Sequence, residues 1–157
     1  MLQRIQSVYL AISLLIGIVF AFLAIAEFDA NDSIYLIKAT GIFYEDASGV
    51  FFESPNESLS VVLIFHLLLT GSSIFQYKNR KMQMKLCALN ILLLFTLTAL
   101  IFFVDFSVPE SIKQGTTPAI NYLFGSLLPI VSVVFQFMAM RSIQKDEKLI
   151  KSTERIR

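Results

Sequence analysis

The sequence predicts an all-α membrane protein: a four-helix transmembrane bundle with both termini inside and a small extracytoplasmic β-rich loop between the first two helices. Three observations support this fold class. The 157-residue chain is 55% hydrophobic and only 16% charged, whereas soluble domains carry about 25% charged residues. Four long apolar segments lack charged side chains, and the charges between them are divided by sign. A water-soluble core of this length cannot bury so much apolar surface.

The four apolar segments are each long enough to cross a bilayer as a helix, which takes about 20 residues. None of them contains Asp, Glu, Lys or Arg. Because a backbone amide in lipid needs a partner inside the protein, we expect helices; a transmembrane barrel would alternate polar and apolar residues. The predicted spans are residues 8–26, 59–77, 86–104 and 120–140, within a single membrane domain that covers residues 1–157.

Charges on the two sides of the predicted spans indicate the orientation. Residues 1–7, the linker 78–85 and the tail 141–157 together carry eleven basic and three acidic residues. Residues 27–58 and 105–119 carry two basic and nine acidic residues. Since short basic segments stay in the cytoplasm, we expect both termini inside, with residues 141–157 as a cytoplasmic helical tail.

The first span has an alternative interpretation as a cleaved signal peptide, because Ala24-Ile25-Ala26 resembles a signal-peptidase site. Two features argue against cleavage. The apolar run of about 18 residues is longer than the roughly 7–15 residues of a signal-peptide core. Cleavage would also leave three spans and place the basic tail outside, unless the topology inverted. We therefore expect the segment to be retained.

The loop 27–58 is the largest segment expected outside the bilayer. Three short runs in it, at 33–38, 41–44 and 50–52, are rich in β-branched and aromatic residues. Such runs favour a small antiparallel sheet. An isolated hairpin is marginal in water, so a third strand, the membrane surface or a partner would complete it. Two roles stay open: a cap that ties the first two helices together, and a docking surface for another protein.

Three polar side chains within the predicted spans are candidates for an intramembrane site. His66 lies near the middle of the second span, and an ionisable residue in a membrane is a functional candidate by default. No Asp or Glu lies in a span to pair with it, and Asn90 and Gln136 are its possible neutral partners. Two interpretations stay open: a neutral His that bridges helices, and a proton-relay or ligand-binding residue.

Small residues recur every four positions in the first span, at Ser13, Gly17 and Ala21. A face of this kind lets another helix approach closely, so it is the candidate helix-packing face. In the fourth span, Gly125 and Pro129 predict a bend. A bend serves packing in a bundle or gating in a transporter.

The sequence offers no constellation for catalysis, a cofactor or a metal. Cys87 is the only cysteine and is expected far in depth from His66, the only histidine, whereas a catalytic cysteine needs a base within reach. Zinc-protease, serine-hydrolase and phosphate-loop motifs are absent. Basic residues are not interleaved with stacking aromatics, as nucleic-acid binding would require. We therefore expect a protein that is not an enzyme, has no cofactor and binds no nucleic acid.

The lipid bilayer is one expected partner. Lys78, Arg80, Lys81 and Lys85 could bind anionic headgroups at about 1 kcal/mol each, although a role as topology determinants already explains these residues. Other membrane proteins are the second expected partner, and they would bind the loop 27–58 and the cytoplasmic tail.

The N-terminal segment carries a specific resemblance. Gln3-Arg4-Ile5-Gln6, followed by Tyr9-Leu10, resembles the opening of an uncharacterised family of small four-span integral membrane proteins from Bacteroidota, a domain of unknown function with a Gln-Arg-Ile-Gln-x-x-Tyr-Leu motif. The resemblance implies a multi-pass protein of the bacterial inner (cytoplasmic) membrane and no activity. Topology needs only Arg4, so we expect Gln3 and Gln6 of this cytoplasmic motif to hydrogen-bond a neighbouring segment or a partner.

Three classes of function remain. The leading hypothesis is a non-catalytic accessory or scaffolding subunit of an inner-membrane complex, in envelope biogenesis or protein export. The alternative is a small transporter or channel component, for which the intramembrane polar residues and the predicted bend would supply the polar or broken helices that transport needs. A membrane enzyme, the third class, would need a lipid substrate and a distributed site.

Overall fold

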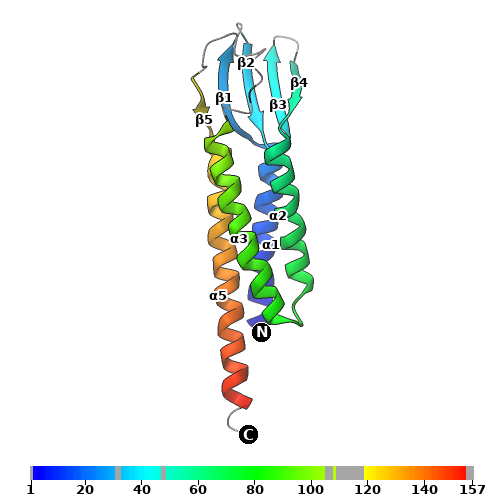
Figure 1. Cartoon of the computed structure of the whole chain (residues 1–157), viewed down its shortest axis with the longest axis vertical. Coiled ribbons are helices and arrows are strands. Elements are labelled where there is room, and N and C mark those ends of the chain that lie inside the picture. The colour runs from blue at the N-terminus through cyan, green and yellow to red at the C-terminus, as the bar shows by residue number, and fades with distance from the viewer. Residues whose placement is uncertain (1, 31–32, 47–48, 105–107, 109–118, 155–157) are drawn as a thin grey trace.

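Four long apolar helices dominate the computed structural model, which describes residues 2–30, 33–46, 49–104, 108 and 119–154 (Figure 1). They are α1 (Leu2–Phe22), α2 (Glu57–Phe75), α3 (Arg80–Phe102) and α5 (Leu128–Glu154). Each is long and apolar enough to cross a membrane, as the sequence predicts. The 19 residues of α2 span about 28 Å at 1.5 Å per residue, close to the ~30 Å hydrocarbon core of a bilayer.

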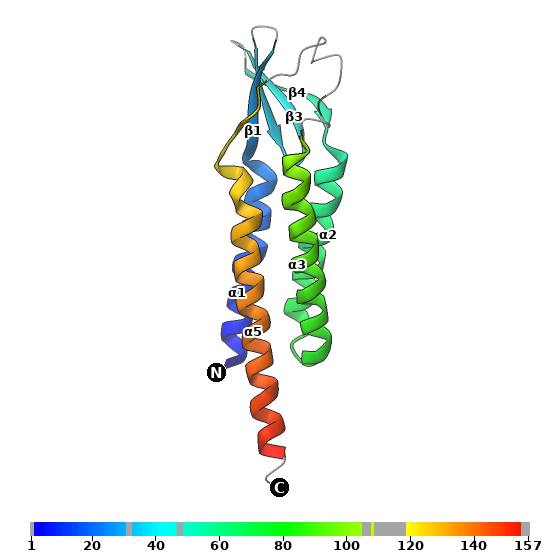
Figure 2. The ribbon, with the colours of Figure 1, turned by 60° about the vertical axis from the view of Figure 1, so that its left-hand side comes forward.

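The four helices form a bundle in which each lies against two neighbours, in the cyclic order α1, α2, α3, α5 (Figure 2). Buried positions recur along every helix at alternating spacings of three and four residues, the pattern of left-handed bundles with interdigitating side chains. These positions are Gln6, Leu10, Ser13, Gly17 and Phe20 in α1; Leu59, Leu63, His66, Thr70 and Ser73 in α2; Gln83, Cys87, Asn90, Leu94, Leu97 and Ile101 in α3; and Pro129, Ser132, Gln136, Ala139, Ile143 and Asp146 in α5.

A five-stranded antiparallel sheet stands at one end of the bundle (Figure 1). Its strands are β1 (Ala24–Ala30), β2 (Ser33–Lys38), β3 (Gly41–Asp46), β4 (Gly49–Pro55) and β5 (Asn121–Tyr122), in the order β4-β3-β2-β1-β5. The predicted all-α class with a small β-rich loop is therefore wrong. The three expected β-prone runs do form strands, but β1 and β5 add the further pairing that an isolated hairpin lacks, and the result is an extended sheet.

The sheet also changes the ends of two predicted spans. α1 ends at Phe22, so residues 24–26 of the predicted first span begin β1. Residues 121–122 of the predicted fourth span form β5, and a short 3-10 helix, η2 (Phe124–Leu127), precedes α5. A short apolar run does not distinguish the end of a span from a buried strand. The predicted tail is helical to Glu154, and residues 155–157 lie outside the described part.

One apolar core runs from the sheet into the bundle. Buried side chains of three strands, Ile25 and Phe28 of β1, Ile37 of β2 and Ile42 of β3, belong to the same cluster as Phe20 of α1, Leu59 and Leu63 of α2, and Leu94, Leu97 and Ile101 of α3. The sheet is thus packed onto the ends of the helices and is not attached by its connections alone.

Backbone contacts at the junction hold the two parts together. Leu123 donates a hydrogen bond to the carbonyl oxygen of Ile25 (2.9 Å). Gly125 packs so closely on β1 that a Cβ there would overlap the carbonyl oxygen of Ala24. On the other side, Asn56 follows β4 directly and accepts from the backbone N–H of Leu59 as the N-cap of α2, so strand and helix are joined without a flexible linker.

Candidate functional site

Among the described residues, six buried polar side chains form a hydrogen-bonded network that joins all four helices. Its centre is Thr70 of α2, whose Oγ1 donates to the carbonyl oxygen of His66 (2.8 Å). The same oxygen accepts from Asn90 Nδ2 of α3 (2.7 Å) and Gln136 Nε2 of α5 (3.2 Å). The hydroxyl thereby uses its one donor and both acceptor sites. All three predicted intramembrane candidates, His66, Asn90 and Gln136, belong to this network.

His66 lies between Asn90 of α3 and Gly17 of α1. Its Nδ1 is 2.8 Å from Asn90 Oδ1. Because Asn90 donates through Nδ2 to Thr70, its Oδ1 is the acceptor, and in this amide orientation Nδ1 of the imidazole carries the proton. A Cβ at Gly17 would lie 2.9 Å from both Nε2 and Cδ2 of the ring. Glycine therefore provides the space that the imidazole occupies.

Ser13 and Ser132 extend the network to α1. The two hydroxyl oxygens are 2.6 Å apart, and Gln136 Nε2 donates to Ser13 Oγ (3.1 Å). Two buried acceptors, His66 Nε2 and Gln136 Oε1, have no hydrogen-bond partner within the described part of the chain. An unpaired buried polar group costs about 1–3 kcal/mol, so these two atoms are where the network has capacity for a further donor.

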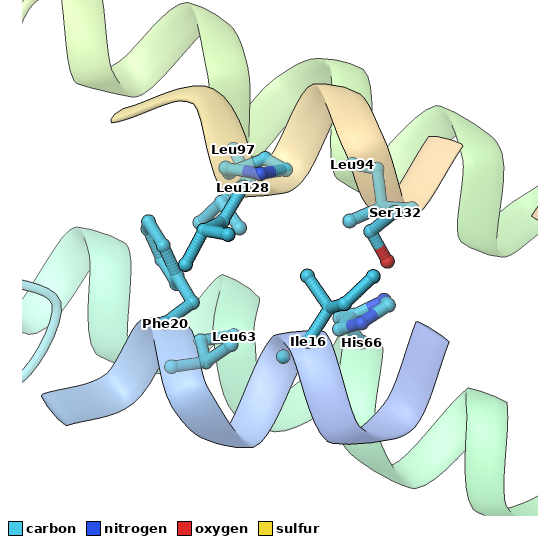
Figure 3. A pocket seen from close by; sticks show the side chains of 10 residues that line it. Ile16, Phe20, Leu63, His66, Leu94, Leu97, Leu128 and Ser132 are labelled. Atoms are coloured by element: carbon cyan, nitrogen blue, oxygen red, sulfur yellow. The ribbon is translucent and has the colours of Figure 1, made fainter. Parts of the chain in front are cut away.

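A small cavity adjoins His66 and Ser132 (Figure 3). Its volume is about 10 Å³, the lower limit for one water molecule. The remainder of its lining is apolar and comes from all four helices: Ile16, Gly17, Phe20, Leu63, Leu94, Leu97, Leu128 and Pro129. A cavity of this size is too small for a transported solute.

The predicted helix-packing face divides between two environments. Ser13 is a member of the network and Gly17 contacts its imidazole. Ala21 instead packs against the apolar core below the sheet. The four-residue spacing that the sequence suggested is therefore only part of the buried stripe of α1, which follows the alternating three- and four-residue pattern.

A second polar cluster lies at the end of the bundle opposite the sheet. Gln6 of α1 donates to Asp146 Oδ2 of α5, and Arg80 of α3 donates to the backbone oxygen of Asp146 (3.4 Å). Gln83 of α3 donates to the carbonyl oxygen of Ser73 in α2 (3.1 Å). The structure thus places Gln6 against a neighbouring helix and turns Arg80 toward α5.

Among the other predicted site residues of this end, the structure describes the side chains of three lysines. Lys78, Lys81 and Lys85 are exposed, where they are free to face headgroups or water. Gln3 and Arg4 belong to α1, but their side chains lie outside the described part of the structure.

The pair Gly125 and Pro129 does not interrupt a helix. Gly125 belongs to η2, and Pro129 is the second residue of α5, where the missing N–H of proline is tolerated. The two residues therefore mark the start of α5 at the junction with the sheet.

Sequence reasoning missed Thr70, Ser132, Gln83 and the burial of Asp146. All four occupy the alternating three- and four-residue stripe of their helices. In a helix with an apolar outer face, polar residues at this spacing mark the inward face. That spacing, applied to every polar residue of the spans and of the segments that flank them, is the signal that would have grouped them.

These polar side chains can align the four helices with one another. The described residues contain no group of three or more His, Cys, Asp or Glu that could hold a metal. The hydrogen-bond contact of Cys87 is Ser73 Oγ, at 3.4 Å, and not a base. Polar groups that pair across four helices at one level specify a single register, because any shift leaves them unpaired in an apolar core.

The sheet is a second candidate site because it exposes large apolar side chains. Ile34 is 46%, Val50 52%, Phe51 41% and Phe52 58% exposed. Phe51 ends a row of aromatic rings that crosses the four long strands with centroid separations of 5.1, 6.2 and 5.2 Å; its members are Phe28, Tyr35, Tyr44 and Phe51. Exposed apolar surface of this kind is typical of an interaction site.

The charges of the sheet are mostly acidic. Its described acidic side chains are those of Glu27, Asp29, Glu45 and Glu53, against the single basic residue Lys38, whose ammonium lies over the ring of Phe43. Burial raises the pKa of Tyr35, and the nearby Glu53 raises it further. The surface is therefore apolar with a negative field.

Comparison with known proteins adds a family but no activity. A family model described as a domain of unknown function (DUF4293) matches residues 2–156. No curated protein matches the chain.

Proposed function

The chain belongs to the family described as a domain of unknown function, DUF4293, and for this member we propose a non-catalytic, accessory or scaffolding role in a complex of the bacterial inner membrane, in envelope biogenesis or protein export. The four helices anchor the protein with both termini in the cytoplasm, and the sheet stands outside the membrane. The sign of the charges supports this orientation, and the N-terminal resemblance supports an origin in Bacteroidota.

One observation carries the proposal: apolar side chains are exposed on the sheet beyond the reach of lipid. The length of α2 matches the hydrocarbon core, so the membrane boundary lies near Asn56, its N-cap. At about 3.3 Å per strand residue, Phe52 lies up to about 13 Å and Val50 up to about 20 Å along the strand from Asn56. Headgroups extend only about 5–8 Å on each side. Lipid therefore does not account for these side chains, and their exposure supports a protein partner.

The bundle suits a scaffolding role because it holds the sheet in a defined position. The shared apolar core and the polar network set the height and register of the helices below the strands. The cavity beside His66 holds about one water at most, so it gives no support to the transporter alternative.

Two experiments test the proposal. Thr40→Cys in the turn before β3 and Ser152→Cys in α5 are both at exposed positions, while the native Cys87 is buried. We expect a membrane-impermeant maleimide to label Thr40→Cys in spheroplasts, and Ser152→Cys only after permeabilisation. After mild extraction from the native membrane, a stoichiometric partner should co-purify. Reversed labelling, or a monomer with no stoichiometric partner, would contradict the proposal.

A further inference from the structure

We propose that the outer edge of β4 binds an extended segment of another envelope protein, apolar and basic in character, by β-strand addition. This inference rests on the proposed docking role of the sheet and specifies the place, the geometry and the chemistry of the partner.

Among the described residues, β4 is the longer of the two edge strands of the sheet. It has seven residues, whereas β5 at the other edge has two. Within the described part of the chain, the pairing partner of β4 is β3 alone. A long strand at a sheet edge presents a row of unpaired backbone groups, which is a template for another strand.

The register shows which backbone groups of β4 point outward. Asp46 pairs with Gly49, with two residues between them in the chain, and Tyr44 pairs with Phe51. In an antiparallel hairpin of this length the closing pair is hydrogen-bonded and alternate pairs are not. Gly49 and Phe51 therefore bond to β3, whereas Val50 and Phe52 direct their N–H and C=O groups away from the sheet.

The stretch Gly49–Phe52 lacks the features that usually protect an edge. It has no Lys or Pro, and its register with β3 is regular; the irregularity of the pair falls after Phe52, at Glu53. Natural edge strands are usually blunted by a charge, a proline or a bulge. Because the other end of β4 leads into α2, this unprotected stretch is the part of the strand farthest from the proposed membrane boundary.

Side chains at the edge offer contacts on both faces of an added strand. Phe51 stacks on Tyr44 on one face, with ring centroids 5.2 Å apart. Phe52 meets Phe43 edge-on on the other face, at 5.4 Å. Both aromatic rows end at β4 with exposed rings, so an apolar side chain on an added strand would continue either row.

The charge of the edge selects a basic partner. Glu53 lies in β4 and Glu45 in the adjacent β3, and Lys38 is engaged with Phe43. Opposite charges across neighbouring strands are favourable and like charges are unfavourable. A segment that alternates apolar side chains with Lys or Arg complements this surface.

A second copy of the chain fits the edge less well. β4 leads directly into α2, so β4 of every copy in one membrane runs toward the bilayer. Two such strands pair only in parallel, which is the less stable arrangement. A segment of another protein that runs away from the membrane pairs in the antiparallel sense that the rest of the sheet uses.

The test uses the full-length protein in lipid nanodiscs and two fluorescent synthetic peptides, one alternating valine with lysine and the other valine with glutamate. Anisotropy titration should show binding of the lysine peptide that is at least about tenfold tighter than that of the glutamate peptide. Val50→Pro removes one outward N–H, a change that an edge strand tolerates, and should weaken binding of the lysine peptide about tenfold. Leu92→Ala, which alters an exposed apolar residue of α3 outside the sheet, should leave binding unchanged.

Val50→Lys is a second variant for use if Val50→Pro does not fold, because it leaves the backbone N–H in place. Its added positive charge should weaken binding of the lysine peptide. Equal binding of both peptides, or unchanged binding by folded Val50→Pro or Val50→Lys, would overturn strand addition. So would Val50→Cys copies that crosslink to one another in the native membrane, since a second copy would then occupy the edge.

Failure of this inference is separable from failure of the docking role. If the native partner co-purifies equally with wild type and Val50→Pro, the docking role stands and strand addition is wrong. If no stoichiometric partner co-purifies with the wild type, the docking role itself is wrong.

Discussion

Substitution of Gly17 by alanine tests whether the space beside His66 is essential to the bundle. The added Cβ would lie 2.9 Å from Nε2 and Cδ2 of His66 and from Cδ2 of Leu67, about 0.6 Å inside a normal carbon contact. The leucine can rotate away, but the imidazole is held by Asn90 at 2.8 Å. Overpacking costs about 1–3 kcal/mol, and loss of the bond to Asn90 about 0.6–1.7 kcal/mol more. Alanine is more favourable than glycine within a helix by about 0.5–1 kcal/mol, which offsets part of this cost. We expect Gly17→Ala to lower the free energy of unfolding by about 1–4 kcal/mol.

Gly71→Ala is the matched control, because a Cβ there meets no atom within 4 Å. The assay is reversible unfolding in mixed micelles of increasing dodecyl sulfate content, followed by circular dichroism. Gly71→Ala should unfold with the wild type or slightly later. In the His66→Ala background, Gly17→Ala should lose most of its cost, because the clashing ring is gone. If Gly17→Ala unfolds together with the wild type, or if Gly71→Ala is equally damaging, the assignment of Gly17 to the imidazole site is refuted.

Two further predictions concern the polar contacts between helices. Thr70→Val keeps the shape of the side chain but removes two interhelical hydrogen bonds, so it should lower the free energy of unfolding by about 1–3 kcal/mol in the same assay. Thr96→Val, the control at an exposed position, should lower it by less than about 0.5 kcal/mol. Equal effects of the two substitutions would argue against the network. Gln6→Ala leaves the buried carboxylate of Asp146 without its amide donor. Amide hydrogen exchange in the first turns of α1 should therefore become about tenfold faster, while exchange in α2 is unchanged. Identical exchange in α1 of the variant and the wild type would show that this contact does not hold the N-terminal turn.

The sequence pattern identified three members of the polar network but not the residue at its centre. His66, Asn90 and Gln136 are conspicuous because each is polar in an apolar run, and they do lie in one network. Thr70, which links two of them, is small and close to neutral in hydropathy, so it does not stand out in the sequence. Its role depends on the crossing of α2, α3 and α5, which no single segment encodes.

In the sheet, three strands could be predicted from their local sequence and two could not. The runs at 33–38, 41–44 and 50–52 have local β character and lie in β2, β3 and β4. β1 begins in a sequence that continues the apolar run of α1, and β5 has only two residues. Neither has a local signature, since each exists as a strand because of its partner: Glu27 pairs with Leu36 on one side and with Asn121 on the other.

Helices of this length and hydropathy are encoded locally, because each backbone hydrogen bond closes within four residues and, in a bilayer, each side chain would meet an apolar environment whatever its neighbours. For this reason, the four apolar helices can be predicted from the sequence alone. The five-stranded sheet, the pairing of Gln6 with Asp146 and the open edge of β4 arise from contacts between segments far apart in the sequence. Those contacts form only when the helices have packed in one register, so the surface on which the proposed function depends is a property of the folded molecule.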